Sequence, residues 1–501
     1  MKSLSDLLLA LALPFSPEHN MVQINHLCLH SQHIRPNSLF LAIKGHSHDG
    51  RNYIADAISR GAAAIFYETS AEPITHSDNA NCPPLIAIDG LNLKLGAIAK
   101  AFYGPIDEHK TLIGVTGTDG KSSVAYFVAQ ALSLAQMPCG LISTLGQGTL
   151  TDLTPGPNTT PDALSLFQSL VNFKHQNIDY IALEASSQGL NEGRLNNIAI
   201  DIAIFTNLTP EHQDYHLTME HYANAKARLF KIPSLRCAIV NRDDPYADTL
   251  LMACRPEVKR ITYSQNNAHA DIHLIKATPT QLGVNLIIST PKGIITTHTQ
   301  LLGRFNISNI LALVGTCLQL KLTLKRITSV LPAIVAPPGR MQLISTPAKL
   351  KAPTVIIDYA HTDNALHAAL SALKYHFKIA KIWCVFGCGG ERDRDKRPRM
   401  AQIAEKLSHR VIITLDNPRN ENPDQIMQDI LNGFSTPKAV KVIHDRKAAI
   451  RYALSMANPT DIILVAGKGH ETIQIINDTK ITLHDESIVN NYYKDQKPCS
   501  L

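Results

Sequence analysis

A short glycine-containing segment has the residue types that bind the phosphates of a nucleotide. Gly117-Thr118-Asp119-Gly120-Lys121-Ser122 follows the apolar run Leu112–Thr116 and precedes the helix-like run Val124–Ala129. Glycines let backbone N–H groups turn toward phosphate oxygens, and the start of a helix adds a favourable dipole. Lys121 would contact the outer phosphates, and the Ser122 hydroxyl would bind Mg2+. We therefore predict an ATP site formed by Gly117, Thr118, Asp119, Gly120, Lys121, Ser122 and Ser123.

The spacing of this segment differs from that of the usual P-loop. The residue five positions before Gly120 is Val115, where a P-loop has glycine. Taken alone, the segment could be an ordinary turn. The apolar run before it and the helical run after it favour the phosphate-binding interpretation.

Further polar motifs follow along the chain. They are Asn158-Thr159-Thr160-Pro161, Glu184-Ala185-Ser186-Ser187-Gln188-Gly189-Leu190, Thr206-Asn207-Leu208-Thr209-Pro210-Glu211-His212-Gln213-Asp214-Tyr215-His216, Lys226, Gly339-Arg340-Met341, Asp358-Tyr359-Ala360-His361-Thr362, Phe386-Gly387-Cys388-Gly389-Gly390-Glu391-Arg392-Asp393, Asp416-Asn417-Pro418-Arg419 and Ala466-Gly467-Lys468-Gly469-His470-Glu471. Each motif is weak evidence by itself. In this order and spacing, over almost the whole chain, the set resembles the Mur ligase family, and most closely its members that add the third residue of the peptidoglycan stem. The resemblance implies an ATP-dependent ligase that joins an amino acid to a UDP-linked muramoyl peptide through an acyl phosphate.

Amide formation from a carboxylate at neutral pH requires an activated acyl group. Attack of the carboxylate on the γ-phosphoryl of ATP would give an acyl phosphate, which an amine then displaces. Because the first step brings two anions together, the protein must supply positive charge. Lys121 and Mg2+ on Ser122 would meet that need.

The family resemblance implies further metal ligands. It assigns Glu184 and His212 to metal binding, and Lys226 as a carbamylated lysine whose new carboxylate holds a second Mg2+. Mg2+ prefers oxygen ligands, which a carbamate provides. On residue type alone, His212 could be a core histidine and Lys226 a solvated helix cation. The catalytic set implied by the family is Lys121, Lys226 and His212.

The resemblance also assigns substrate-binding residues. For the nucleotide it implies Asn306, Asn309, Arg340 and Asp358, although Asn306 could be a turn or cap residue. For the UDP-linked muramoyl dipeptide it implies Leu29, Ser31, His46, Ser47, His48, Asn158, Thr159, Thr160, Ser186, Glu192 and Arg194. A surface loop is the alternative for His46–His48. A guanidinium such as that of Arg194 suits an anionic phosphate or carboxylate.

The motif Asp416-Asn417-Pro418-Arg419 resembles the form found in family members that add meso-2,6-diaminopimelate. That amino acid carries a second carboxylate, which an arginine can hold with two hydrogen bonds. The predicted diaminopimelate site is Arg392, Asp416, Asn417, Pro418, Arg419, Gly467 and Glu471, with Glu471 binding the far ammonium. An enzyme that adds L-lysine would have no use for Arg419 there, and a surface arginine in a turn is the remaining alternative.

Several positions depart from the family pattern. Asp119 stands where asparagine is usual, Gln188 replaces a histidine, and Glu192 replaces a glutamine. His30 and Gln32 flank Ser31, where aspartate and arginine are expected. We expect a divergent but active ligase, with a paralogue of altered substrate as the alternative.

The elements that position these residues follow an alternating pattern. Short apolar runs alternate with helix-like stretches, which predicts an α/β protein with largely parallel sheets. Breaks at Tyr103-Gly104-Pro105 and Pro337-Pro338-Gly339 suggest three domains. We predict a UDP-binding α/β domain over residues 1–105, a central P-loop ATPase domain with a parallel sheet over 106–337, and a Rossmann-like α/β domain that binds the amino acid over 338–501.

The predicted strands in this pattern are Leu39–Ile43, Leu112–Thr116, Thr354–Ile357, Ile382–Phe386, Val411–Thr414 and Ile462–Val465, and a first amphipathic helix is expected around Leu7–Leu13.

The composition fits a globular cytoplasmic protein. Of 501 residues, 45% are hydrophobic and 18% charged, and the net charge of +6 is too small to indicate nucleic-acid binding. Nine scattered cysteines predict reduced thiols rather than a disulfide framework. No stretch approaches the about 18 apolar residues that span a membrane. We expect a monomer that binds small-molecule substrates.

Two other functions share part of the pattern. A folylpolyglutamate synthase would share the central ATP domain but would not need the first domain or Asp416–Arg419. A P-loop kinase or nucleotide-gated binding protein would have no role for Lys226.

Overall fold

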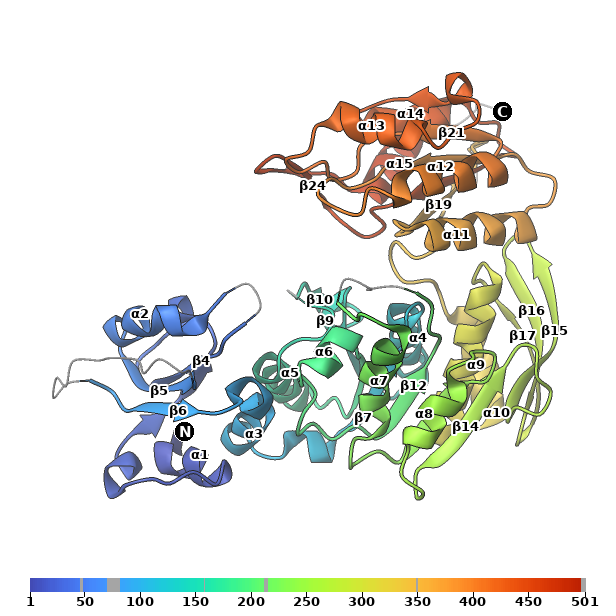
Figure 1. The fold of residues 1–501 in the computed structure, drawn as a ribbon. Coiled ribbons are helices and arrows are strands. Elements are labelled where there is room, and N and C mark those ends of the chain that lie inside the picture. The colour runs from blue at the N-terminus through green and yellow to red at the C-terminus, as the bar shows by residue number, and fades with distance from the viewer. Residues whose placement is uncertain (46–47, 70–81, 157, 211–214, 348–349, 497–501) are drawn as a thin grey trace. The chain divides into compact units, whose positions relative to one another are not determined.

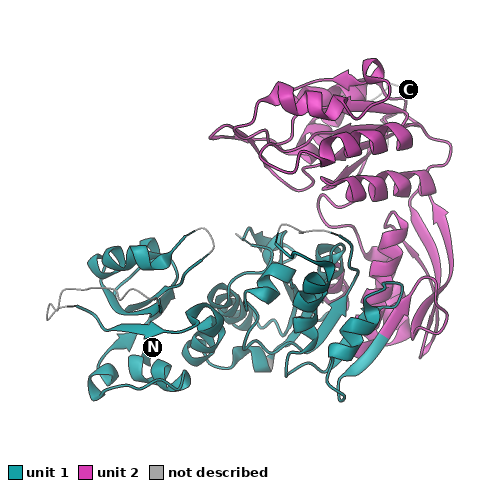
Figure 2. Cartoon of the chain, in the orientation of Figure 1, with its two compact units in different colours: residues 1–125, 136–261 teal, residues 126–135, 262–501 magenta. Residues whose placement is uncertain are grey.

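The computed structural model describes the chain apart from residues 46–47, 70–81, 157, 211–214, 348–349 and 497–501. Three predicted site residues, His46, Ser47 and His212, therefore lie outside the described residues. The chain forms two compact units (Figure 2). Unit 1 comprises residues 1–125 and 136–261, and unit 2 comprises residues 126–135 and 262–501.

Unit 1 begins with a small α/β layer (Figure 1). Its parallel sheet has the order β3 (His26–Cys28), β4 (Ser38–Ala42), β5 (Ala62–Glu68) and β6 (Leu85–Ile88). In β4, Leu39 and Leu41 pack into one core, whereas Phe40 and Ala42 pack into another. This alternation buries both faces of the predicted strand. The surrounding elements are β1 (Lys2–Ser3), α1 (Leu4–Ala10), β2 (Gln23–Ile24), α2 (Ile54–Ser59) and α3 (Leu91–Tyr103).

The larger sheet of unit 1 carries the predicted phosphate loop. Its parallel centre is β8 (Cys139–Ser143), β11 (Tyr180–Glu184), β7 (Thr111–Thr116), β12 (Ile202–Phe205) and β13 (Cys237–Asn241), in that order. On the outer side of β8, β9 (Gly146–Thr149) and β10 (Asp152–Thr154) pair antiparallel. The helices of this unit are α5 (Ala163–His175), α6 (Ser187–Asn191), α7 (Met219–Phe230) and α8 (Ala247–Ala253), and α4 (Lys121–Leu134) begins in it and continues as part of unit 2. Because the central strands are parallel, the loops after β7, β11 and β12 emerge at one edge.

The longer stretch of unit 2 begins within β14 (Lys259–Ser264), whose last two residues pair with β15 (Ile272–Thr280). The strands β15, β16 (Gly283–Thr290) and β17 (Gly293–Thr299) are antiparallel. They are followed by α9 (Arg304–Gln319) and α10 (Leu324–Val330).

A six-stranded sheet forms the rest of unit 2. Its order is β18 (Gln342–Ile344), β19 (Thr354–Asp358), β23 (Ile462–Ala466), β20 (Ile382–Phe386), β21 (Arg410–Ile413) and β22 (Lys441–Val442), and all strands but β18 are parallel. The other elements are α11 (Asp363–His376), α12 (Lys396–Leu407), α13 (Pro423–Leu431), α14 (Arg446–Met456), α15 (Asp485–Asp495) and the hairpin of β24 (Ile473–Ile476) and β25 (Thr479–Thr482). Ile356 and Leu464 face one core, and Val355 and Val465 face the other, so both faces of the sheet are covered.

The structure confirms the predicted α/β class. Each predicted strand lies within one residue of an observed strand, and the first helix begins earlier, at Leu4. The hairpins around β9–β10 and β15–β17 add antiparallel strands to a sheet expected to be parallel. The domain boundaries near residues 105 and 337 stay a prediction.

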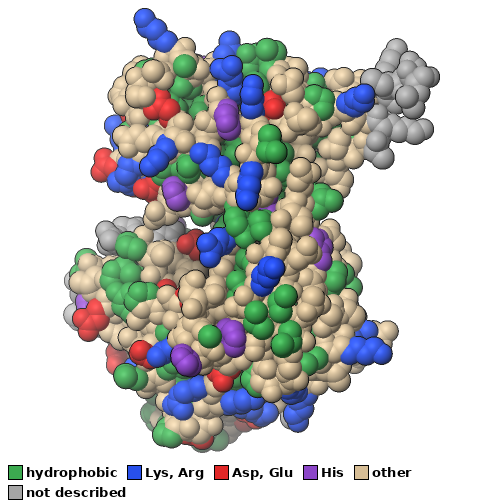
Figure 3. Space-filling view, turned by 90° about the vertical axis from the view of Figure 1, so that its right-hand side faces the viewer, with side chains coloured by type: hydrophobic (Ala, Val, Ile, Leu, Met, Phe, Trp, Pro, Cys, Tyr) green, Lys and Arg blue, Asp and Glu red, His purple; other side chains and the backbone are tan. Residues whose placement is uncertain are grey.

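The sequence analysis also made predictions about charge distribution, cysteines and membrane-spanning segments. The face in Figure 3 shows Lys and Arg side chains dispersed among neutral ones. The eight cysteines in the described part of the chain are all free. Burial raises the pKa of several of these thiols, such as that of Cys317, to about 12. Among the described helices, none is long and apolar enough to cross a membrane.

Candidate functional site

The loop after β7 has the local structure of a phosphate cradle. Gly117 and Gly120 have φ angles of +152° and +83°, and a Cβ on Gly117 would lie 1.9 Å from Thr206 Oγ1. Glycine is therefore required where the loop passes the neighbouring strand. Lys121 begins α4, and its Nζ donates to the carbonyl oxygens of Gly117 (3.0 Å) and Thr118 (2.7 Å). The Lys121 side chain therefore lies over the loop that precedes α4.

The segment after β12 holds this loop in place. The N–H of Thr118 donates to Asn207 O (2.8 Å), and the N–H of Asp119 donates to Asn207 Oδ1 (2.9 Å). Thr206 Oγ1 donates to Asp119 O (2.6 Å). The motif Thr206–Thr209 therefore has a structural task that the sequence analysis did not assign. The Asp119 side chain itself is exposed.

Lys226 lies against the phosphate loop although it is more than a hundred residues away in sequence. Its Nζ donates to Gly117 O at 2.6 Å and lies 4.3 Å from the centre of the Tyr222 ring. Its side chain is 1% exposed, so it is not a solvated helix cation. Thr218 caps the start of α7 and accepts from the N–H of His221, which fixes the helix that carries Lys226.

Glu184 approaches the loop from the neighbouring strand. It ends β11, is 1% exposed, and lies opposite Val115 in the register of β11 with β7. One carboxylate oxygen accepts from the N–H of Thr144 (3.0 Å) and the other from Thr144 Oγ1 (3.4 Å). A buried carboxylate and the Ser122 hydroxyl at this edge are hard oxygen donors of the kind that Mg2+ prefers. His, Cys, Asp and Glu side chains of the described residues form no metal-binding group of three or more.

Five of the residues predicted to bind the muramoyl peptide form one hydrogen-bonded network. Thr160 Oγ1 donates to Glu184 O (2.8 Å), and the N–H of Ser186 donates to Thr160 Oγ1 (2.9 Å). Arg194 donates to Thr160 O (2.7 Å) and to Glu192 Oε2 (2.6 Å). Thr159 is linked through the hydroxyl of Thr144 (3.1 Å). Asn158, the sixth, is exposed.

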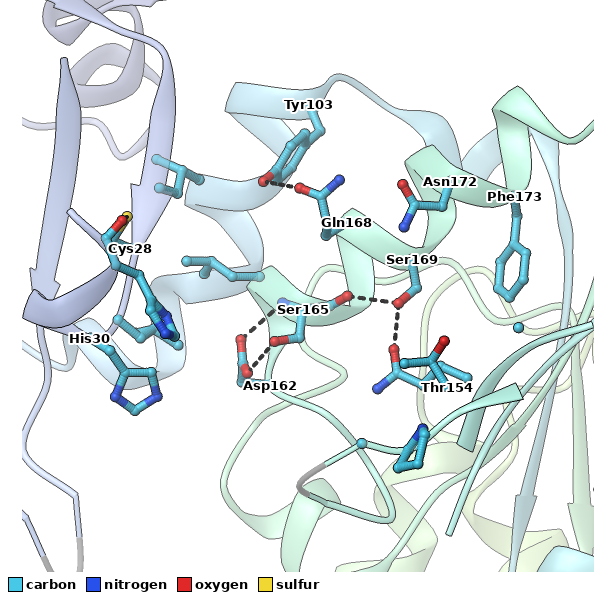
Figure 4. Close-up of a pocket in the computed structure, with 18 of the residues that line it drawn as sticks. Cys28, His30, Tyr103, Thr154, Asp162, Ser165, Gln168, Ser169, Asn172 and Phe173 are labelled. Atoms are coloured by element: carbon cyan, nitrogen blue, oxygen red, sulfur yellow. Dashed lines mark hydrogen bonds between the residues drawn. The ribbon is translucent and has the colours of Figure 1, made fainter. Parts of the chain in front are cut away.

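A cavity of about 620 Å³ lies beside the residues predicted to bind the UDP group (Figure 4). Leu29 and His30 line it together with side chains of α3 and α5. Within it, Tyr103 donates to Gln168 Oε1 at 3.1 Å. The sequence analysis missed Tyr103 and Gln168, because single residues on two helices carry no motif. Ser31 is buried, and its hydrogen bond to Asp56 lowers the pKa of that carboxyl. His48 is exposed.

The residues predicted to contact ATP from unit 2 fall into two groups. Asn306 and Asn309 are buried in the first turns of α9, where Asn309 Nδ2 donates to Asn306 Oδ1 (2.9 Å) and Asn306 Nδ2 donates to Leu302 O (2.8 Å). Asp358 ends β19 and accepts from the N–H groups of Met341 (2.7 Å) and Ala360 (2.8 Å). These bonds fix the loop that carries Arg340.

Two loops of unit 2 cross with their backbones in contact. A Cβ on Gly339 would lie 2.1 Å from His470 N, and one on Gly469 would lie 2.7 Å from Gly339 O. Both glycines have positive φ, +67° and +53°. The crossing places Arg340 and the Gly467–Glu471 loop side by side. The Arg340 guanidinium lies 4.6 Å from the centre of the Tyr359 ring, and Tyr359 OH lies 3.5 Å from Glu471 Oε1.

The structure brings the predicted amino-acid residues together. Glu471 Oε2 accepts from Asn417 Nδ2 (3.1 Å), and a Cβ on Gly467 would lie 2.6 Å from Asp416 Oδ2. Arg419 has a φ of +52° and donates from Nη1 to Gly390 O (2.7 Å). A Cβ on Gly389 would lie 3.2 Å from Arg419 Nη1 and 3.7 Å from Arg392 Cγ, so both arginines flank Gly389. Pro418 is buried between Asn417 and Arg419.

Buried ion pairs that the sequence analysis missed support this pocket. Arg397 is fully buried and donates to both carboxylate oxygens of Glu421 (2.7 Å each) and to Asp429 (2.8 Å). Glu421 also accepts from the N–H of Glu391 (2.9 Å), which anchors the loop of Arg392. The bonds from Arg397 lower the pKa of Glu421 to about 2.

A second ion pair and a buried carboxyl lie under the Gly467 loop. Arg446 donates to Asp485 (2.7 Å) and to Ala466 O (3.0 Å), and both side chains of the pair are fully buried. Burial raises the pKa of Asp416, although the positive charges of Arg446 and Lys468 oppose the shift.

Known protein families match the parts of the chain that carry these residues. Family models described as "Mur ligase family, catalytic domain", "Mur ligase middle domain" and "Mur ligase, glutamate ligase domain" match residues 23–103, 115–317 and 339–469. The UDP-N-acetylmuramoyl-L-alanyl-D-glutamate--2,6-diaminopimelate ligase of Ectopseudomonas mendocina is 42% identical over 464 residues, covering 93% of this chain and 94% of the relative. That of Pseudomonas putida is 44% identical over 461 residues, covering 91% and 92%. A solved structure of a ligase with the same name is 32% identical, has a TM-score of 0.72 and matches over 99% of each chain.

Proposed function

The chain belongs to the Mur ligase family, and on that premise we propose that it joins meso-2,6-diaminopimelate to UDP-N-acetylmuramoyl-L-alanyl-D-glutamate, using ATP. The reaction extends the stem peptide of the peptidoglycan precursor. ATP and UDP-linked precursors are cytoplasmic molecules, so we place the reaction in the cytoplasm, catalysed by a monomer.

The first step activates a carboxylate of the D-glutamyl residue. A carboxylate oxygen attacks the γ-phosphorus of ATP, the bond from that phosphorus to the bridging oxygen of ADP breaks, and an acyl phosphate forms. The Lys121 ammonium, which lies over the carbonyl groups of Gly117 and Thr118, is placed to offset the charge of the transferred phosphoryl group.

Mg2+ fits the donors at this edge of the sheet. Ser122 and Glu184 would hold one ion, and His212 with Lys226 as a carbamate would complete the metal sites. The ions would supply positive charge beside the phosphoryl group. The buried position of Lys226 against Gly117 O supports a role for this side chain at the phosphates, which a kinase would not need.

In the second step an amino group of diaminopimelate, having lost a proton, attacks the acyl carbon. The tetrahedral intermediate collapses as the bond from carbon to the phosphate oxygen breaks, which releases phosphate and leaves the amide. The network of Thr160, Ser186 and Arg194 would hold the acyl donor, the UDP-linked dipeptide, close to Glu184.

The observation that carries the specificity proposal is the arrangement of charged and polar side chains in unit 2. Arg419 and Arg392 flank Gly389, whereas Glu471 and Asn417 are hydrogen-bonded to each other. Diaminopimelate has a carboxylate and an ammonium at its far end, and these two sides offer a partner to each. L-Lysine lacks the far carboxylate and would leave the arginines without a partner.

Phosphate release tests the proposal directly. The protein is incubated with ATP, Mg2+ and UDP-N-acetylmuramoyl-L-alanyl-D-glutamate, with meso-diaminopimelate, L-lysine or no amino acid. We expect release with diaminopimelate at least about a hundredfold faster than with L-lysine. Equal or faster release with L-lysine would contradict the specificity, and release without the UDP-dipeptide would contradict the ligase.

A further inference from the structure

Lys468 is a fully buried lysine in the amino-acid pocket, and the proposed reaction gives it no task. It follows β23 and precedes Gly469, and its side chain is 0% exposed. An ammonium group away from water is unfavourable unless each N–H finds an acceptor. Its position therefore needs an explanation.

The three N–H groups of Lys468 have three acceptors. Its Nζ donates to Ile473 O (2.7 Å), Glu471 Oε2 (2.8 Å) and Asn417 Oδ1 (3.1 Å). An ammonium has three donors, so none is left for a substrate. Lys468 can act on a substrate only through the groups that it holds.

These bonds leave the two carboxylate oxygens of Glu471 in different environments. Oε2 accepts from Lys468 and from Asn417 Nδ2, whereas Oε1 has only the long contact of 3.5 Å with Tyr359 OH. The Asn417 amide is fixed as well, because its Oδ1 accepts from Lys468 and from the N–H of Ile475 (3.0 Å). Oε1 of Glu471 is thus the oxygen with room for another donor.

The same contacts keep Glu471 charged. Burial would raise the pKa of Glu471, but the hydrogen bond and charge of Lys468 and the hydrogen bond from Asn417 lower it below its usual value. The charged and titratable groups that interact with Glu471 are Lys468, His470, Tyr359, Asp416 and Arg446. Lys468 is the one cation in that set that bonds directly to the carboxylate.

We infer that Lys468 is a positioning residue for the far ammonium of the incoming amino acid, because it holds Glu471 Oε2 and the Asn417 amide so that Glu471 Oε1 faces the substrate. This inference rests on the proposed function, since it needs a diamino acid in this pocket. Lys468 itself does not touch the substrate.

Lys468→Met tests the inference, because methionine keeps the apolar stem and removes the charge. We expect the KM for diaminopimelate to rise about tenfold, with kcat and the KM values for ATP and the UDP-dipeptide within about twofold of wild type. The KM of the variant should also rise as pH falls from about 8 to about 6, because Glu471 without its cation takes up a proton more readily. Lys480→Met, an exposed change in β25, is the matched control and should alter none of these values.

A double variant separates positioning from a general structural effect. If Lys468 acts through the charge of Glu471, adding Lys468→Met to Glu471→Gln should change the KM for diaminopimelate by less than about twofold. The same tenfold rise in both backgrounds would overturn the inference, as would an unchanged KM in Lys468→Met. If the single variant does not fold, the comparison of Glu471→Gln with the double variant, which leaves no unpaired buried charge, decides alone.

The wild-type protein separates this inference from the proposed function. If wild type shows no release with diaminopimelate, the proposed function fails and the inference fails with it. If wild type uses diaminopimelate and the double-variant comparison shows no dependence on Glu471, only the role of Lys468 is wrong.

Discussion

The loop after β7 in unit 1, our proposed phosphate loop, and the proposed amino-acid site of unit 2 hold their charged groups in opposite ways. Lys121 donates to backbone carbonyl groups of the loop, at Gly117 and Thr118. In the proposed amino-acid site, Lys468 donates to the Glu471 carboxylate as well as to Ile473 O and Asn417 Oδ1, and beside the site Arg397 donates to the Glu421 carboxylate. A lysine held by neutral carbonyl groups keeps its charge available to an incoming phosphate, whereas one paired with a carboxylate has its charge already offset. The first arrangement suits transition-state stabilisation, and the second suits a rigid recognition pocket.

This contrast predicts that substitutions in the phosphate loop lower kcat, whereas substitutions in the proposed amino-acid site raise the KM for diaminopimelate. The largest effect is expected for Lys121→Ala. Loss of the ammonium should lower kcat for phosphate release by about a thousandfold, since a cation at the transferred phosphoryl group acts mainly in the transition state. Lys174→Ala, an exposed change in α5, should have no effect. A loss confined to the KM for diaminopimelate would contradict the contrast.

Arg419→Ala is expected to have the next largest effect. Removal of one of the two guanidinium groups beside Gly389 should raise the KM for diaminopimelate about thirtyfold and leave kcat within about threefold. Steady-state kinetics with each substrate varied in turn would measure this. The control is Arg410→Ala, which changes an exposed arginine of β21. If the variant instead accepts diaminopimelate normally, the pocket is wrongly assigned.

Glu421→Gln addresses stability and its pH dependence. Arg397 lowers the pKa of Glu421 to about 2, so the pair contributes stability that is present above the unfolded value near pH 4.5 and is lost as pH falls toward 2. We expect the variant to be less stable by about 2 kcal/mol at pH 7, allowing for solvent screening. Urea unfolding of the two proteins should then converge only below about pH 2. Asp478→Asn, exposed in the β24–β25 hairpin region, should change neither curve; a constant difference at all pH values would rule out the ion pair as the cause.

The smallest effect is expected for Asp119→Asn, which restores the usual residue of the loop. The Asp119 side chain is exposed, so water screens its repulsion of ATP. The KM for ATP should fall about threefold, and more at low salt than at high salt. Glu220→Gln in α7 serves as the control for a lost negative charge. A thousandfold rise in kcat would mean that Asp119 blocks the site, contrary to our expectation of an active enzyme.

The fold and the candidate site differ in how far the sequence could predict them, and contiguous segments were easier to predict than contacts between distant residues. Gly117–Ser122 is a contiguous segment, and its position between a strand and a helix could be predicted from order and spacing, whereas its phosphate-binding role stays a proposal. The strands were predictable for a similar reason, because a fully buried parallel strand is a short apolar run. Arg419 and Glu471 could be proposed as site residues because each lies in a motif of its own, and their roles stay a prediction.

The supporting groups could not be predicted in that way. Arg397 and Glu421 are 24 residues apart and meet only after α12 and the Asp416–Arg419 turn have packed. In the sequence, Arg397 is one of many charged residues in a basic stretch. Tyr103 and Gln168 line one cavity from two helices, and neither lies in a recognisable pattern. Partnership between distant side chains is set by the tertiary fold and leaves no local signature.

The crossing of Gly339 and Gly469 constrains how this enzyme could diversify. Neither glycine can gain a side chain without pushing the other loop away, so a change at one position has no tolerated first step. Arg340, proposed to contact the nucleotide, and the loop of Glu471, proposed to recognise the amino acid, are therefore held to each other by this close backbone contact. Specificity for another amino-acid substrate could instead evolve by replacement of Arg419, whose side chain is half-buried at the edge of the proposed site. Such a change of specificity would leave the contact between Gly339 and Gly469 unchanged.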